Sequence, residues 1–445
     1  MRISPLIVFT CALFMCAPAR ATMIEEVTSK GGIKAWLVED HKLPLIAMHF
    51  AFRGGVEQDP QDRQGLATLT MSLMTEGAGS YDANAFQQQL ADHSISLHFA
   101  AGRDDLSGGL KFLREERATG FDLLRVALTA PRFDDAAIAR AKSRQLTGIR
   151  YQLGDPDWQA RYALLSHIFA GHPYDRRSLG TEKTLAAITR ADIQVFAADH
   201  LARDNLLIAV AGDITPVELG DALDQTFGKL SLKVKLAPVV EVIWPHDTPA
   251  ILVPRDGTQT SLLFARPGPK RLDPDWYAAE IANYILGGGG FSSRLMHEVR
   301  DKNGLTYGIS TDLAPMEHAA MIVGDAATDN PKTGKAWDIT RAVWKNFFAN
   351  GATPEEIQGA KDYLTGALPL AMTSTDAIAG VLVSMQEERL GRDYLDRYKS
   401  LIDGATAADV MNVIKRWFDP AQLTLVMVGK PEGITPSVTE PQVKE

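Results

Sequence analysis

The chain has 445 residues, of which 45% are hydrophobic, and its 55 acidic side chains outnumber 46 lysines and arginines, for a formal net charge of -9. An acidic balance argues against nucleic-acid binding, because proteins of that class normally present a basic face to the phosphates. The length allows a large hydrophobic core and predicts two or more domains.

The N-terminal segment, residues 1–21, has the features of a secretory signal peptide. Arg2 supplies a cationic start, residues 6–15 are apolar, and Ala19-Arg20-Ala21 resembles a cleavage site with small residues at both ends. An N-terminal membrane anchor is the alternative, but the apolar run is shorter than the roughly 20 residues that a membrane span needs. We therefore expect cleavage before Thr22 and a periplasmic protein with no membrane contact afterwards.

Both cysteines of the chain, Cys11 and Cys16, lie inside the predicted signal peptide. The mature protein would then have no thiol, which excludes disulfides, thiolate metal sites and cysteine catalysis. Removal of Arg2 and Arg20 would also take the formal charge from -9 to -11.

The sequence after residue 22 repeats itself once, at low identity but in a consistent register. Three motifs recur at nearly constant offsets: 138–142 with 357–361, 191–193 with 408–410, and 206–208 with 423–425. Several matches in nearly the same register favour a duplication over chance. We therefore predict two homologous halves, 22–230 and 249–435, joined by the proline-containing linker 231–248 and followed by a flexible tail, 436–445.

Each half reads as strands, then helices, then a closing strand. Apolar or alternating runs predict strands, whereas longer segments with helical periodicity predict helices. Thr353-Pro354 has the form of an N-cap followed by proline at the first helical position. Strands and helices without strict alternation indicate an α+β fold. The expected elements are strands at 45–52, 206–211 and 423–428, and helices at 135–146, 157–169 and 355–368.

The segment 286–308, LGGGGFSSRLMHEVRDKNGLTYG, places an arginine and a tyrosine behind a glycine-rich loop. Gly287, Gly288, Gly289 and Gly290 end one helix, and Phe291-Ser292-Ser293 opens the next. We expect Arg300 in the last turn of that second helix and Tyr307 on the following strand, with a turn that brings their side chains together. The structural alternatives are a cation that stabilises a helix C-terminus and an ordinary strand aromatic.

Arg300 and Tyr307 behind a glycine-rich loop resemble the second half of the pitrilysin and insulinase family of zinc peptidases. Gly54-Gly55, Gly65-Leu66-Ala67 and Glu76-Gly77 fit the opening of the family's first half. The resemblance covers nearly all of the mature chain. It implies two homologous α+β halves, arranged as a clamshell around a peptide substrate, in which the Arg–Tyr pair donates hydrogen bonds to the substrate carbonyl or the developing oxyanion.

The zinc site that this resemblance implies is missing from the chain. The family's inverted motif, H-x-x-E-H, has two histidine ligands and a glutamate base, and it should directly follow Gly65-Leu66-Ala67. Thr68, Met71 and Ser72 occupy those positions, and Gly148 stands at or beside the place of the further glutamate ligand. No glutamate occurs between residues 116 and 182, so the absence does not depend on the alignment.

The ten histidines offer no replacement metal site that the sequence reveals, and we expect no metal in this chain. None of them forms an H-x-x-x-H or H-x-x-E-H pair, and the five-residue spacing of His93 and His98 should place them on opposite faces of a strand. His297-Glu298 begins like H-E-x-x-H but lacks the second imidazole, so it is read as surface helix. His167 and His172 could flank a turn, but the sequence reveals no third ligand near them.

The leading hypothesis is the zinc-less subunit of an exported two-chain peptidase, similar to the division of labour in mitochondrial processing peptidase. A homologous partner with H-x-x-E-H would hold the zinc, and this chain would supply Arg300 and Tyr307 to the shared peptide site. The alternative is a binding or scaffolding protein that has kept the fold and lost catalysis, as in the core subunits of respiratory complexes that resemble these peptidases. A self-sufficient zinc enzyme is the least favoured reading, because four positions are missing.

Overall fold

A computed structural model describes residues 23–444, and the predicted signal peptide, residues 1–21, lies outside this range. The first half forms a six-stranded sheet in the order β1-β2-β6-β3-β5-β4, mostly antiparallel, with one parallel pair between β2 and β6. The predicted strands at 45–52 and 206–211 are β3 and β6. The strands are β1 (Glu25–Thr28), β2 (Lys34–Glu39), β3 (Leu45–Arg53), β4 (Ser96–Ala101), β5 (Asp105–Leu113) and β6 (Leu206–Gly212).

Five strands of the second half repeat this plan, whereas the sixth, β12, pairs parallel with β7. Its sheet has the order β12-β7-β11-β8-β10-β9, and β7 and β11 form the parallel pair that corresponds to β2 and β6. This shared topology and the common register of the recurring motifs agree with a duplicated α+β fold. The strands are β7 (Ala250–Pro254), β8 (Gln259–Pro267), β9 (Ile309–Pro315), β10 (Ala320–Asp329), β11 (Thr424–Gly429) and β12 (Val438–Thr439).

The helices follow local capping signals. Thr353 accepts a hydrogen bond from the amide of Glu356 over 3.2 Å, and the Glu356 carboxylate accepts one from the amide of Thr353 over 2.8 Å, which completes a capping box. The helices of the first half are α1 (Leu66–Leu73), α2 (Ala83–Asp92), α3 (Arg117–Thr129), α4 (Asp135–Gly154), α5 (Pro156–Ile168), α6 (Glu182–Ala187), α7 (Arg190–His200) and α8 (Pro216–Phe227). Those of the second half are α9 (Trp276–Asn283), α10 (Thr333–Asn350), α11 (Pro354–Ala367), α12 (Thr375–Glu387), α13 (Tyr394–Gly404) and α14 (Ala407–Trp417).

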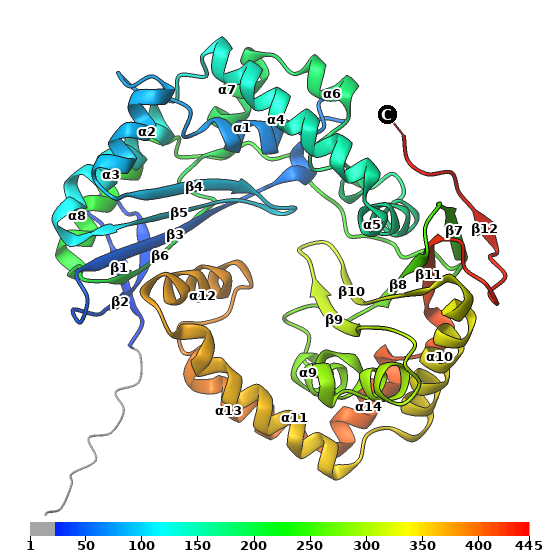
Figure 1. Ribbon diagram of the computed structural model, residues 1–445. Coiled ribbons are helices and arrows are strands. Elements are labelled where there is room, and N and C mark those ends of the chain that lie inside the picture. Colours follow the sequence, from blue (N-terminus) through cyan, green and yellow to red (C-terminus); the bar gives the residue numbers. More distant parts are fainter. Residues whose placement is uncertain (1–22, 445) are drawn as a thin grey trace, which may run out of the picture.

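The two halves exchange one helix each. α5 of the first half packs against β8 and β11 of the second sheet, and α12 of the second half packs against β3 and β6 of the first sheet (Figure 1). Asp157 of α5 accepts a hydrogen bond from Ser261 of β8 over 2.7 Å. Asp376, at the corresponding place on α12, lies 3.3 Å from the ring nitrogen of His49 on β3. The duplication therefore extends to a reciprocal contact that ties the halves together.

The exchanged helices explain the side-chain alternation in the central strands. On β3, the large residues Ile46, Met48 and Phe50 belong to the core under the first half's own helices, whereas Ala47 and Ala51 share a cluster with α12. Small residues on that face leave room for the helix backbone to approach the sheet, as strand alternation allows.

The linker and the tail both lie against the folded halves. The amide of Ala237 donates to the side chain of Gln58 over 2.8 Å, and the amide of Val242 donates to the carbonyl of His318 over 2.9 Å. The structure differs from the expected flexible tail, because β12 pairs with β7 and the amide of Val443 donates to the side chain of Gln159 over 2.9 Å. Unpaired main-chain groups at the edge of the second sheet provide the partners for this segment.

Within residues 23–444, no single helix is long and apolar enough to cross a membrane. One bent pair, Pro354–Met372 and Thr375–Glu387, meets the length and composition criteria with a bend of 119°. The second member of this pair is α12, the helix that packs against the first sheet.

Candidate functional site

The glycine-rich loop lies against β9 because its glycines permit close backbone approach. α9 ends in a π-helical turn, Tyr284–Gly288. A Cβ atom on Gly287 would lie 2.4 Å from the hydroxyl oxygen of Thr311 on β9, so a larger residue would displace the loop. Gly290 has a φ of +55°, in the left-handed region that glycine adopts without strain. The loop therefore needs glycine at both positions, and π-helical turns of this kind are frequent at functional sites.

Arg300 is held by contacts with three neighbouring residues. It lies in a second π-helical segment, Met296–Asp301. Its Nε atom donates to the main-chain carbonyl oxygen of Tyr307 over 3.0 Å, and its Nη1 atom donates to Asp301 over 2.7 Å. The guanidinium carbon lies 4.8 Å from the centre of the Phe291 ring. The remaining nitrogen, Nη2, makes no hydrogen bond with the residues that the structure describes, so it is available to another acceptor.

Tyr307 presents its phenol ring to solvent. It is 87% exposed and lies two residues before β9 begins at Ile309, so the expectation that it sits on the strand is wrong. Gly308 and the turn stabilised by Thr306, whose hydroxyl donates to the Gly308 carbonyl over 2.6 Å, separate it from the strand. The structure brings Arg300 and Tyr307 together through the main chain of Tyr307, and the phenol is available as a second donor.

Three of the predicted degenerate zinc positions lie on α1, where their side chains make structural contacts. The hydroxyl of Thr68 donates to the carbonyl of Ser178 over 2.7 Å, and that of Ser72 donates to the carbonyl of Leu69 over 2.8 Å. Met71 is 2% exposed and belongs to the hydrophobic core of the first half. A buried apolar side chain thus occupies the position at which the resemblance predicts the catalytic glutamate.

The fourth position, Gly148, lies on α4 beside α1. A Cβ atom there would lie 3.1 Å from a methyl group of Leu179, the residue after the Ser178 that binds Thr68. The structure therefore keeps the helices that would carry a zinc site next to each other, although the ligands are missing.

A buried network fixes α1 in this place. The carboxylate of Asp59 accepts hydrogen bonds from the amides of Gly65 and Ala67 over 2.7 and 2.8 Å. The side chain of Gln145 on α4 donates to the carbonyls of Gly65 and Leu179 over 3.1 and 2.9 Å. Burial raises the pKa of Asp59 to about 7. Neither residue was predicted from the sequence.

Several of the described histidines contact individual residues. Among residues 23–444, no group of three or more histidine, cysteine, aspartate or glutamate side chains is arranged to hold a metal ion. His93 ends α2 and bonds to Glu116 over 2.8 Å, so it does not share a strand with His98 of β4 as expected. His172 contacts the carbonyl of Val240 over 2.8 Å.

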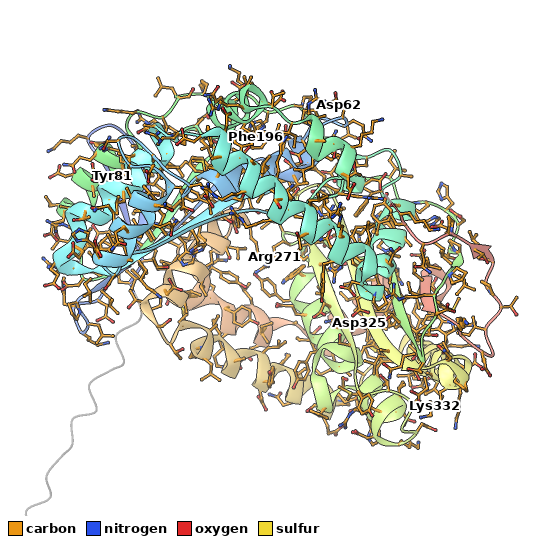
Figure 2. The ribbon with its side chains drawn as sticks, turned by 45° about the horizontal axis from the view of Figure 1, so that its top comes forward. Asp62, Tyr81, Phe196, Arg271, Asp325 and Lys332 are labelled. Atoms are coloured by element: carbon orange, nitrogen blue, oxygen red, sulfur yellow. The ribbon has the colours of Figure 1, made fainter. Side chains whose placement is uncertain are left out.

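A cavity of about 630 Å³ lies between the two halves, with the linker forming part of its wall. Arg271, one of its charged residues, points into the middle of the molecule (Figure 2). Arg53 of β3 crosses the boundary, because its Nη2 atom donates to the carbonyls of Gln386 and Glu387 at the end of α12 over 2.9 and 3.2 Å. A guanidinium there also favours the negative end of the helix dipole.

Acidic side chains outnumber basic ones around this cavity, at seven to four. Burial raises the pKa of Glu57 and of Glu387 to about 7, and the neighbouring carboxylate of Asp105 adds to the effect on Glu387. Burial also lowers the pKa of Arg53. The boundary between the halves therefore contains carboxyl groups that titrate near neutral pH.

Three comparisons with known proteins find similarity to the same family. Residues 187–364 match the model of the peptidase M16 inactive domain. The non-peptidase homolog YmxG of Helicobacter pylori is 27% identical over 377 residues, which are 82% of this chain and 84% of that protein. The crystal structure of a peptidase M16 inactive domain from Pseudomonas fluorescens is 28% identical, with a TM-score of 0.86 over 95% of this chain and all of that one.

A larger solved protein contains the same fold. The periplasmic protease PqqL of Escherichia coli aligns with a TM-score of 0.79 at 14% identity, and the match covers 93% of this chain but 46% of PqqL. At this identity the match reports the fold alone. The duplicated topology and these matches make the chain similar to the M16 family of pitrilysin- and insulinase-type peptidases, and its sequence lacks the family's H-x-x-E-H motif.

Proposed function

We propose that this chain is the zinc-less subunit of an exported two-chain metallopeptidase and that it supplies Arg300 and Tyr307 to the site of a homologous partner. The observation that carries the proposal is an asymmetry between its halves. The expected positions of the zinc ligands hold Thr68, Ser72 and Gly148, whereas Arg300 and Tyr307 are both present and the phenol of Tyr307 is exposed.

The arrangement of donors suits stabilisation of negative charge. Peptide hydrolysis places a negative charge on the former carbonyl oxygen, and preorganised donors directed at that oxygen lower the barrier. Arg300 is already oriented by Phe291, Asp301 and the Tyr307 carbonyl, so little reorganisation is needed when substrate binds. The partner's zinc would activate the water, and Arg300 Nη2 and the phenol of Tyr307 would bind the oxyanion.

Two of the matched proteins support this proposal. The H. pylori relative carries the name of a non-peptidase homolog, and a chain of this length covers less than half of the protease PqqL. In PqqL the remaining length has room for a second unit of similar size. We infer that the second unit of this peptidase is a separate polypeptide that binds this chain. The two would act on a peptide substrate in the periplasm.

The test is reconstitution. The mature chain should be purified from the native periplasm with its bound proteins, and any companion that carries H-x-x-E-H should be produced separately. The proposal expects peptide hydrolysis from the mixture at a rate well above that of either chain alone. A companion that is fully active without this chain, or a chain that co-purifies with no such companion, would favour the scaffolding alternative.

A further inference from the structure

The tip of the glycine-rich loop carries a phenylalanine that is not used by the core. Phe291 is 69% exposed, an unusual position for a large aromatic side chain that could be buried. The guanidinium carbon of Arg300 lies 4.8 Å from the centre of its ring. This separation is within the range in which an arginine is attracted to the face of an aromatic ring.

The loop backbone sets the direction of this ring. Gly290, immediately before Phe291, adopts the left-handed conformation. Ser293, which is 1% exposed, donates from its hydroxyl to the carbonyl of Gly290 over 2.7 Å, and its amide donates to the same oxygen over 3.0 Å. The turn from Gly290 to Ser293 is thus closed on itself, and it holds Phe291 outward over Arg300.

Each neighbour of Arg300 restricts a different part of its guanidinium group. The Tyr307 carbonyl binds Nε, Asp301 binds Nη1, and the central guanidinium carbon lies 4.8 Å from the centre of the Phe291 ring. The two hydrogen bonds hold the Nε–Nη1 edge of the guanidinium plane. Without the Phe291 ring, the plane could still rotate about that edge. We propose that Phe291 is a positioning residue that locks the plane of Arg300 and so directs Nη2 toward the substrate.

This inference rests on the proposed function for its consequence in catalysis, but its geometric part can be tested in the isolated chain. Because Phe291 buries little surface, replacing it should change the stability of the fold only slightly. The effect should instead appear at Arg300. Phe291→Ala removes the ring, whereas Phe291→Tyr keeps it and serves as the conservative variant.

The first experiment is NMR of the Nε–H signal of Arg300 in arginine-labelled mature chain, assigned by its disappearance in Arg300→Lys. We expect Phe291→Ala to shift this signal and to speed its exchange with water about two- to fivefold, in line with the strength of an exposed cation–π contact. Phe291→Tyr should leave both properties near those of the wild type. An unchanged signal in Phe291→Ala, or an equal change in Phe291→Tyr, would overturn the inference.

The second experiment is a double-mutant cycle in the reconstituted peptidase. We expect Phe291→Ala to lower kcat/KM about two- to fivefold in the wild-type background and to have no further effect in Arg300→Ala, because a positioning residue acts only through the group that it positions. If Arg300→Ala lowers activity and Phe291→Ala is equally harmful in both backgrounds, the positioning role is wrong and the proposed function stands. If Arg300→Ala has no effect on activity, the proposed function fails, and the NMR result alone decides the geometric inference.

Discussion

The Nε atom of Arg300 donates a hydrogen bond to the main-chain carbonyl oxygen of Tyr307 over 3.0 Å. Because the acceptor belongs to the backbone, any residue at position 307 would provide it. The phenol of Tyr307 is therefore not needed to hold Arg300, and its exposure leaves the hydroxyl available to a substrate. The two side chains can accordingly be altered one at a time, with the geometry of the other preserved.

The first prediction concerns metal binding at α1 and α4. The isolated mature chain should contain no stoichiometric zinc by elemental analysis, because Thr68, Ser72 and Gly148 offer no strong zinc ligand. The triple variant Thr68→His, Ser72→His, Gly148→Glu should bind close to one zinc ion, since the two histidines would lie one helical turn apart on α1 and α4 packs beside it.

Met71 remains unchanged in that design because it is buried, and a glutamate there would place a carboxylate in the core. The matched control replaces the glycine alone, Gly148→Glu, and should not bind zinc. Failure of a folded triple variant to bind zinc would contradict the placement of α1 and α4. Stoichiometric zinc in the wild-type chain would contradict the zinc-less assignment.

The second prediction concerns pH and Glu387 at the boundary between the halves. Burial raises the pKa of this carboxyl from 4.5 to about 7, so the folded state holds its proton more tightly than the unfolded state. The contribution of protonated Glu387 to the free energy of unfolding is fully present below about pH 4.5 and is lost as the pH rises through 7. Glu387→Gln, which cannot ionise, should equal the wild type near pH 5 and exceed it by about 1–2 kcal/mol near pH 8.

Denaturant unfolding at a series of pH values measures this difference. Glu115→Gln, an exposed glutamate beyond the boundary, is the control and should follow the wild type throughout. A parallel pH dependence in Glu387→Gln and the wild type would show that the Glu387 carboxyl is not desolvated by the contact between the halves.

The third prediction concerns the exchanged helices. Ala160 of α5 and Ala379 of α12 stand at equivalent places in the two halves and are 2% and 0% exposed. Leucine at either position should destabilise the chain by about 1–3 kcal/mol through overpacking against the opposite half's sheet. Because each helix belongs to both halves, calorimetry should still show one transition at a lower temperature.

Ala408→Leu, at an exposed position on α14, is the control for the added side chain and should change the midpoint little. Two separate transitions in the wild-type chain, or a midpoint unaffected by Ala379→Leu, would mean that the halves do not depend on the exchange of α5 and α12.

The duplication, the α+β class and the location of many elements could be predicted from the sequence, because they follow from local pattern and a repeated register. The helix predicted at 355–368 is α11, and the strand at 423–428 is β11. The exchange of α5 and α12 could not be predicted. The periodicity of apolar residues shows which face of a helix is buried, but it does not show which of the two sheets that face packs against. The tail was misjudged for a similar reason, since its pairing with β7 depends on a distant open edge.

The candidate site was predicted in part. The spacing of Arg300 and Tyr307 correctly indicated that a turn brings them into contact, but it suggested contact between side chains, and the structure has a side chain bound to a main-chain carbonyl. The cation–π contact of Phe291 has no sequence signature, because it depends on the left-handed conformation of Gly290 and the closed turn to Ser293. Asp59 and Gln145 were missed because their partners are main-chain groups of α1 and its surroundings.

The most direct test of the central claim is the kcat of peptide hydrolysis by the reconstituted pair, with an H-x-x-E-H partner saturated by this chain. Arg300→Ala and Tyr307→Phe should each lower kcat by about 100- to 1000-fold, as expected for the loss of an oxyanion donor. The controls Arg125→Ala on α3 and Tyr151→Phe on α4 remove similar groups elsewhere and should leave kcat unchanged. A partner whose kcat is the same alone, with the wild-type chain and with Arg300→Ala would contradict the claim.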